Sequence, residues 1–161
     1  MVNFTRAGGG CDQVVYINMD FSTCVLQNYD ECRFEPENAW SQMMFFCGMD
    51  KRCNEKNGEW ALNRAMENVD KYYSVVGVLE ELDLSLEVFE AYIPRVFAGA
   101  KETYVKAEEK LGIINKNEGK PKISEEVKEL VRNQMGNEIK FYEFCKQRLH
   151  RQAEFTRGLS H

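Results

Sequence analysis

The sequence predicts an α/β fold that is mostly helical, with one or two core strands. Apolar residues recur at helical spacing over residues 59–73 and again over residues 127–149. Residues 75–79 form a short apolar run rich in β-branched side chains, which is typical of a strand buried on both faces. The chain has 161 residues, 43% of them apolar, so a single core can form without added metals or bridges.

The segment before residue 59 predicts two short helices. Asp20 is a typical N-cap for the first, which ends near Leu26. A turn at residues 35–38 opens the second, which runs toward Phe46. The helix over residues 59–73 then places four apolar side chains on one face, at Leu62, Met66, Val69 and Tyr73.

The residues after the expected strand fit a helix better than a second strand. Alternating apolar side chains over residues 82–88 would suit a strand. The length of the segment and its acidic start at Glu80 and Glu81 favour a helix over residues 81–93, because acidic side chains suit a helix N-terminus. Pro94 interrupts the pattern, and a second helix is expected from there to about residue 107.

A basic loop and a long helix complete the chain. Residues 108–123 contain two glycines, one proline and four lysines. Ser124 is an N-cap followed by two glutamates, and it predicts one long helix that Gly158 ends. The apolar stripe of this helix is Val127, Val131, Met135, Ile139, Tyr142, Cys145 and Leu149.

The charge is divided unevenly along the chain. Residues 1–94 contain 7 Lys/Arg and 16 Asp/Glu, a balance of −9, whereas residues 95–161 contain 14 and 10, a balance of +4. A basic segment in an acidic protein is consistent with an anionic ligand, and equally with a solvated helix that carries many lysines.

The six cysteines favour an oxidising compartment. Cys24, Cys32, Cys47 and Cys53 lie in one window of 30 residues without a CxxC pair, which favours two disulfides over a zinc site or buried thiols. Disulfides persist in oxidising compartments, yet the first residues carry no apolar signal segment. Unless its thiols stay reduced, the chain is expected to be the later part of a longer protein.

No self-sufficient catalytic motif is present in the sequence. The phosphate-binding loop GxxxxGK[ST], the nucleophile motif GxSxG and the zinc motif HExxH are all missing. His150 falls on the polar part of the last helix, where a surface role is expected. Cys145 falls in its apolar stripe, where a buried free thiol is expected. Cys11 has no evident partner.

Five motifs in a fixed order resemble one family. They are Cys24-x7-Cys32, Phe45-Phe46-Cys47-Gly48-x4-Cys53, Trp60-Ala61-Leu62-x2-Ala65, Val76-Gly77-Val78-Leu79-Glu80-Glu81-Leu82 and Pro94-Arg95-x-Phe97-x-Gly99-Ala100. This series resembles the C-terminal part of the glycosaminoglycan uronosyl 2-O-sulfotransferases, which include the heparan sulfate and uronyl enzymes and the insect Pipe relatives. Residues 1–19 lie outside the resemblance, and residues 20–157 are expected to form the C-terminal part of the sulfotransferase domain.

The resemblance implies a fold, a reaction and a compartment. The fold is a P-loop-like α/β domain similar to nucleotide kinases, in which residues 75–79 would be a sheet strand. The reaction is transfer of a sulfuryl group, without a metal, from 3′-phosphoadenosine-5′-phosphosulfate to the 2-OH of a uronic acid. The compartment is the Golgi lumen, with a membrane anchor in the full-length protein. The implied disulfides are Cys24–Cys32 and Cys47–Cys53.

The resemblance also implies ligand-contacting residues and partners. The acceptor would be a glycosaminoglycan such as heparan sulfate, with no nucleic acid and with a homotrimer as the assembly. Asn3 begins a sequon that permits glycosylation if the segment enters the lumen. The donor contacts carried over or displaced by a small shift are Tyr104, Lys110, Asn115, Lys116 and Lys120.

Two family parts are not found in this sequence. The catalytic histidine and the loop that binds the 5′-phosphosulfate would precede everything matched, and residues 1–19 contain neither. The chain alone is therefore predicted to be inactive. Two other interpretations remain open: a non-catalytic luminal module that binds a polyanion or a partner subunit, and a small cytosolic helical protein with reduced thiols.

Overall fold

The computed structural model describes residues 20–29, 32, 41–55, 57–111 and 121–158. Within these ranges the regular structure is helical and no residue is in a β-strand. The elements are α1 (Phe21–Leu26), α2 (Gln42–Cys47), η2 (Lys51–Asn54), α3 (Glu59–Tyr72), η3 (Leu79–Glu81), α4 (Leu82–Tyr92), α5 (Pro94–Phe97), α6 (Ala100–Leu111), α7 (Glu125–Gln134) and α8 (Gly136–Gly158).

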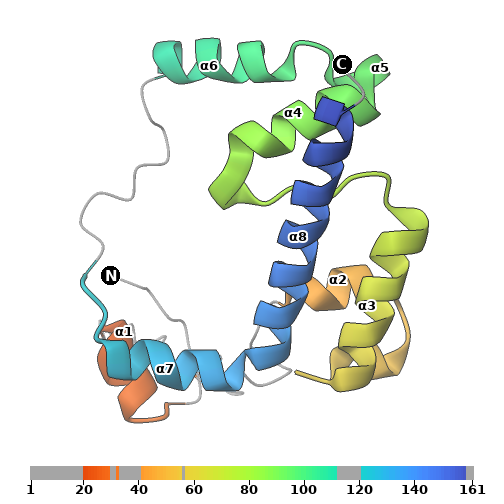
Figure 1. Cartoon of the computed structure of the whole chain (residues 1–161). Coiled ribbons are helices and arrows are strands. Elements are labelled where there is room, and N and C mark those ends of the chain that lie inside the picture. Colours follow the sequence, from red (N-terminus) through yellow and green to blue (C-terminus); the bar gives the residue numbers. More distant parts are fainter. Residues whose placement is uncertain (1–19, 30–31, 33–40, 56, 112–120, 159–161) are drawn as a thin grey trace, which may run out of the picture.

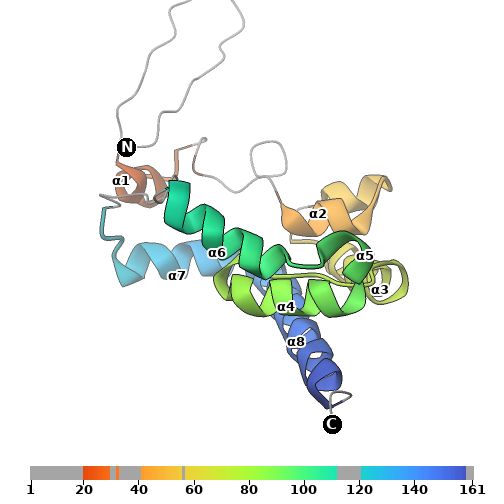
Figure 2. The same ribbon diagram turned by 90° about the horizontal axis from the view of Figure 1, so that it is seen from above.

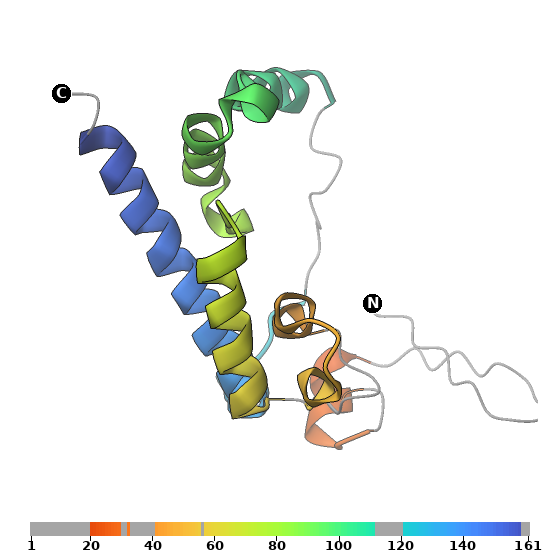
Figure 3. The same ribbon diagram turned by 90° about the vertical axis from the view of Figure 1, so that its right-hand side faces the viewer.

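Helix α8 is the long central helix of the molecule, and the other helices lie near its two ends. Helices α2 and α3 lie beside its first half, and α4 to α6 lie near its C-terminal end (Figure 1). Helices α1 and α7 lie at the opposite end from α6, as the view from the side also shows (Figure 3). Seen from above, α4 and α8 cross one another, and α1 sits against α7 (Figure 2).

Three separate apolar clusters hold these helices together. The largest joins α2 and α3 to α8 through residues such as Met43, Val69 and Phe141. A second joins α1 to α7 through Val25 and Val127. The third joins α4 and the preceding segment to the second half of α8, and its buried members are Val78, Val88, Leu149 and Ala153.

The local signals predicted α1 and α3 correctly, and α2 ends near Phe46 as expected, whereas the turn expected at residues 35–38 lies outside the described residues. Asp20 caps α1 by accepting a hydrogen bond from the backbone N–H of Thr23 at 3.0 Å. Helix α3 occupies the expected range and buries Leu62 and Val69. Both disulfides are present, with Cα–Cα distances of 5.8 Å for Cys24–Cys32 and 5.6 Å for Cys47–Cys53. Cys145 is buried and free, as expected.

The prediction of a strand at residues 75–79 is wrong, because these described residues form no strand. Val78 has an extended backbone, with φ −120° and ψ 139°, but it pairs with no strand, and Leu79 already belongs to η3. A β-branched run becomes a strand only when a neighbouring strand receives its backbone hydrogen bonds. Here the hydroxyl of Ser85 takes that place, since it donates to the carbonyl of Val78 and accepts from its N–H, both at 3.0 Å.

The two helices expected at residues 94–107 and 124–158 are each broken in two. Gly99 has φ +76°, a left-handed conformation that separates α5 from α6. Met135 ends α7 with ψ 24°, and α8 begins at the next residue. This second break is held from outside the helix, because Asn57 accepts from the backbone N–H of Asn137 at 2.5 Å.

Candidate functional site

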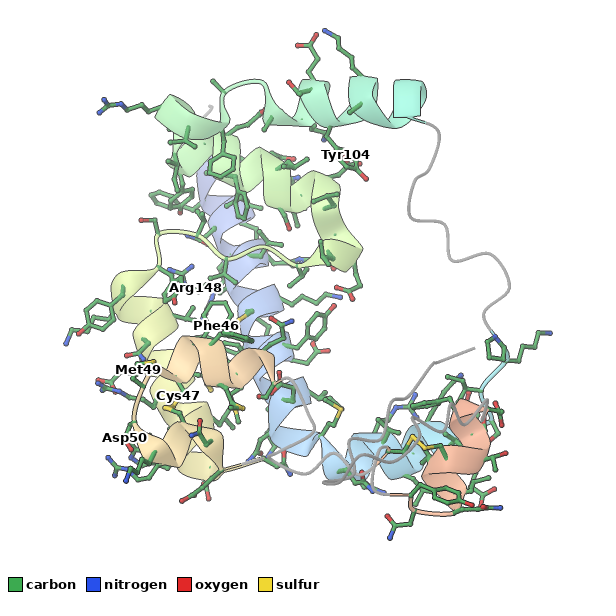
Figure 4. All side chains as sticks on the ribbon, turned by 180° about the vertical axis from the view of Figure 1, so that it is seen from behind. Phe46, Cys47, Met49, Asp50, Tyr104 and Arg148 are labelled. Carbon is green, nitrogen blue, oxygen red and sulfur yellow. A yellow bond between two sulfur atoms is a disulfide. The ribbon has the colours of Figure 1, made fainter. Side chains whose placement is uncertain are left out.

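Tyr104, the donor contact expected from the resemblance, lies on α6. The start of that helix is anchored to α4, because the carboxylate of Glu90 accepts from the backbone N–H of Lys101 at 3.0 Å. Lys106 and Glu102 form an ion pair along the helix surface. The Tyr104 side chain is 39% exposed, and it projects from the side of α6 that looks toward the end of the molecule where α7 lies (Figure 4). It is therefore open to a ligand.

The other expected donor contacts are not placed beside Tyr104. Lys110 belongs to the last turn of α6, but its side chain lies outside the described part of the chain. Asn115, Lys116 and Lys120 lie outside the described residues altogether, as does the sequon at Asn3. These assignments stay predictions.

The Cys47–Cys53 disulfide holds a small charged loop at the surface. Inside this loop the carboxylate of Asp50 accepts from Arg52 Nε at 3.0 Å and Arg52 Nη2 at 2.7 Å. The Arg52 guanidinium also lies 3.8 Å above the ring of Trp60. These hydrogen bonds from Arg52 lower the pKa of Asp50 to about 2. The loop thus contacts α3 through Arg52 and Trp60, while Met49 is fully exposed.

A cavity of about 390 Å³ lies between α2, α8 and the segment that leads to α4. Most of its wall is apolar, and two carboxylates contribute to it. Glu138 accepts from the hydroxyl of Ser41 at 2.6 Å and from the backbone N–H of Met43 at 3.1 Å. Glu80 accepts from the hydroxyl of Tyr142 at 3.3 Å. The lining residues are Gln42, Phe46, Val76, Gly77, Val78, Leu79, Glu80, Glu138, Ile139, Phe141, Tyr142 and Cys145.

Cys145 lines this cavity as an unreactive thiol. Burial raises the pKa of the thiol to about 11, so it stays protonated at neutral pH and is a poor nucleophile. The stripe of apolar residues on the last helix had indicated this environment correctly.

The acidic pair before α4 has partners that sequence reasoning missed. Glu81 accepts from Lys146 Nζ at 2.9 Å and contacts His150 Nε2 at 2.5 Å. The hydrogen bond from Lys146 is the main cause of a lowered pKa for Glu81, with His150 a smaller one. The pair marks a helix start as predicted, because Glu81 is the N-cap residue of α4, and Glu81 also fastens that start to α8. No sequence signal links residues 69 positions apart.

Among the described residues, the structure contains neither a metal-binding cluster nor a membrane-spanning helix. No group of three or more His, Cys, Asp and Glu side chains that could hold a metal occurs among them. None of the helices in that part of the chain is both long and apolar enough to span a bilayer.

Comparison with known proteins gives a consistent set of relatives. The chain is 38% identical over 145 residues to a Drosophila melanogaster protein named uronyl 2-sulfotransferase homolog pip, and the match takes in 85% of this chain. It is 35% identical over 133 residues to human uronyl 2-sulfotransferase, covering 82% of this chain. It is 35% identical over 126 residues to chicken heparan sulfate 2-O-sulfotransferase 1, covering 78%. This chain is a homologue of the uronyl and heparan sulfate 2-sulfotransferases.

The homology covers only part of each relative. The chain spans 28% of the Drosophila protein, 32% of the human protein and 35% of the chicken protein. No protein-family model matches the chain. The resemblance found in the cysteine, Trp-Ala and Val-Gly-Val-Leu motifs is confirmed. The match does not by itself give this chain the activity of the complete relatives.

Proposed function

We propose that this chain forms the C-terminal part of a Golgi sulfotransferase domain of P-loop-like fold. The complete domain would transfer a sulfuryl group from 3′-phosphoadenosine-5′-phosphosulfate to the 2-OH of a uronic acid in a glycosaminoglycan such as heparan sulfate. The observation that carries this proposal is the identity of 35–38% to named 2-sulfotransferases over 78–85% of the chain.

The reaction defines what the chain would need from a second part. The acceptor oxygen forms a bond to sulfur while the bond from sulfur to the phosphate oxygen breaks, which leaves adenosine 3′,5′-bisphosphate. The proton of the acceptor hydroxyl passes to a base, and donors stabilise the charge on the transferring group. Among the described residues, no histidine lines the cavity. His150, in the second half of α8, is bonded to Glu81 instead. Base and phosphosulfate loop would come from elsewhere in the domain.

Within the complete domain, the proposed role of α6 and the basic loop is to bind the sulfuryl donor. The exposed ring of Tyr104 is suited to stack on or hydrogen-bond the adenosine. Lys110, Asn115, Lys116 and Lys120 would surround the 3′-phosphate, where lysines form charge-assisted hydrogen bonds with the anion. Only the Tyr104 side chain is described, and its exposure on α6 supports this assignment.

A chimera tests the proposed function. Residues 20–157 replace the homologous stretch of the Drosophila relative, and transfer of labelled sulfate onto heparan sulfate is measured. We expect turnover by the chimera and none by the 161-residue chain alone. A chimera that folds but transfers no sulfate to any uronic acid acceptor would contradict the proposal, and so would turnover by the isolated chain.

Tyr104 is tested in the same chimera. Tyr104→Ala is expected to raise the KM for the donor about tenfold or more, because base–aromatic stacking is worth about 1–3 kcal/mol. Tyr72→Ala is the matched control, since Tyr72 is also exposed but lies on α3. Equal donor KM values for Tyr104→Ala and the unmodified chimera would exclude Tyr104 from the donor site.

A second candidate function is supported by the charge distribution. The balance of +4 in residues 95–161 suits a luminal module that binds a polyanion without catalysis. Under this alternative, the isolated chain binds heparin at physiological salt and the chimera stays inactive.

A further inference from the structure

A pair of asparagines joins the start of α8 to the loop before α3. Asn137 donates its backbone N–H to the side-chain Oδ1 of Asn57 at 2.5 Å, and its side-chain Nδ2 donates to the backbone carbonyl of Asn57 at 2.6 Å. The two residues are 80 positions apart in the sequence. Both hydrogen bonds therefore depend on one loop residue, Asn57.

The Asn57–Asn137 contact lies where α7 and α8 meet at a sharp angle (Figure 1). The main helical neighbours of α7 are α1 and α8, whereas α2 and α3 pack on α8. The direction of α7 relative to α2 and α3 is therefore set by the few contacts at this break. Asn57 supplies two of them from the loop before α3.

The backbone of this loop favours asparagine followed by glycine. Asn57 has φ +54°, a left-handed conformation that asparagine adopts more readily than most residues with a side chain. Gly58 is the N-cap residue of α3, and a Cβ there would lie 2.9 Å from the carbonyl oxygen of Glu55. The turn thus selects the dipeptide Asn57-Gly58, which is the single Asn-Gly pair in the sequence.

An asparagine that precedes glycine is prone to deamidation, because no side chain shields the following backbone nitrogen. In this reaction the nitrogen of Gly58 gives up its proton to solvent and forms a bond to Cγ of Asn57. The bond between Cγ and Nδ2 breaks, and Nδ2 takes a proton from solvent and leaves as ammonia. One water molecule then opens the resulting succinimide and yields isoaspartate or aspartate.

In the folded chain both reacting groups are held by other partners. The N–H of Gly58 donates to the carbonyl of Glu55 at 3.0 Å, and the side-chain amide of Asn57 accepts from Asn137. The Gly58 nitrogen reaches Cγ only after the Asn57 side chain turns away from Asn137, so the attack requires local opening of this contact. Both hydrogen bonds of the contact are exposed to solvent, and such opening leaves the apolar clusters intact.

We propose that Asn57 is a deamidation site protected by its contact with Asn137, and that conversion to isoaspartate abolishes this contact permanently. Isoaspartate routes the main chain through the former side chain and lengthens it by one methylene group. The two oxygens that bond Asn137 are then displaced, and the break between α7 and α8 loses both hydrogen bonds from the loop. The proposal does not depend on the proposed function, because water is the only co-reactant.

Peptide mapping by mass spectrometry measures the reaction in the 161-residue chain. With both disulfides intact, deamidation of Asn57 at neutral pH is expected to be about tenfold faster in concentrated urea than in the folded chain. The urea sample gives the rate of the unprotected dipeptide. Absence of deamidation at Asn57 in urea would overturn the proposal, and so would equal rates in the folded and unfolded chains.

A matched pair of alanine variants tests whether local opening controls the rate. Asn137→Ala removes the hydrogen bond from Nδ2 to the carbonyl of Asn57 and is expected to speed deamidation of the folded chain about fivefold. Asn68→Ala is the control, since its side-chain amide also donates to backbone carbonyls, those of Phe46 and Cys47, away from Asn57. Equal acceleration by the two variants, or none by Asn137→Ala, would overturn the proposal.

Hydrogen exchange at the Asn137 amide tests the consequence of the modification. In chain purified with isoaspartate in place of Asn57, this amide is expected to exchange about tenfold faster than in the unmodified chain, because it has lost its acceptor. Asn57→Asp keeps the length of the main chain and an acceptor oxygen, so it is expected to preserve the protection. Unchanged protection in the isoaspartate form, or equal loss of protection in Asn57→Asp, would overturn the proposed loss of the contact.

Discussion

Both disulfides close loops of similar length, with sequence separations of 8 and 6 residues, but they lie in very different cores. Among the described residues, Cys47 and Cys53 are two of nine buried members of the cluster that joins α2, α3 and α8. Cys24 and Cys32 are two of only four in the cluster that joins α1 to α7. The Cys47–Cys53 bridge reinforces a core that other side chains already form, which we call the first core. Cys24 and Cys32, in contrast, supply half of the buried residues of their own core, which we call the second core.

The largest expected effect comes from emptying the first core. Met43→Ala removes a fully buried side chain and is expected to lower the free energy of unfolding by about 2–5 kcal/mol. Urea denaturation followed by circular dichroism measures this loss of unfolding free energy. The labelling rate of the buried Cys145 thiol reports whether the first core has become more accessible. We expect faster labelling in the variant. A loss below 1 kcal/mol would show that α2 packs on α3 less tightly than the structure indicates.

The next effect is local to the second core. Replacing Cys24 and Cys32 by alanine is expected to cost about 2–4 kcal/mol of local stability, because Val25 and Val127 are then the only fully buried side chains of the described cluster that holds α1 against α7. Hydrogen exchange should show α1 losing protection while α3 keeps it and Cys145 labelling stays unchanged.

The matched variant with Cys47 and Cys53 replaced tests the same contrast from the other side. Here α2 is expected to keep its protection, since Met43, Leu62 and Phe141 still bury it. Equal loss of protection in α1 and α2 would mean that both bridges serve their cores in the same way.

A smaller effect is expected where α8 meets α2. Glu138→Ala removes the acceptor for the hydroxyl of Ser41 and the N–H of Met43, at an expected cost of about 1–2 kcal/mol. Glu138→Gln keeps an acceptor oxygen and should lose less. An alanine variant that unfolds at the same urea concentration as the unmodified chain would indicate that this contact adds nothing to the first core.

The smallest effect is the pH dependence of the Cys47–Cys53 loop. Arg52 lowers the pKa of Asp50 from 3.8 to about 2, so the folded state favours the ionised carboxylate. The contribution is therefore present above pH 4 and lost as the pH falls from 4 to 2. Asp50→Asn should remove this dependence, which an NMR titration of the loop amides measures. A midpoint for the Asp50 carboxyl near its ordinary value would rule out the Arg52 contact in solution.

Sequence patterns predicted the parts of the fold that local signals decide. The N-cap at Asp20, the apolar face of residues 59–73 and the placement of Cys145 all depend on a few neighbouring residues. The disulfide pairing came from the family resemblance, and the spacing of the cysteines agreed with it.

Apart from the break at Gly99, which a left-handed glycine makes locally, the failures involve a distant partner. Residues 75–79 have the composition of a strand, but Val78 bonds to Ser85 in place of a neighbouring strand, and the break at Met135 is held by Asn57. The contact of Glu81 with Lys146 and His150 is of the same kind. For the candidate site, only Tyr104 could be placed, and its role depends on the resemblance because no spacing rule identifies a nucleotide contact.

The position of the second core in the chain has a consequence for the order of folding. The Cys24–Cys32 loop closes over a short separation, whereas Val25 and Val127 are about 100 residues apart, and loop closure over such a distance is slow and costs more entropy. During synthesis the bridge can form while α7 is still to be made. Helix α1 would then emerge as a covalently closed loop with an uncovered apolar face, and that face would stay uncovered until α7 (Glu125–Gln134) is made.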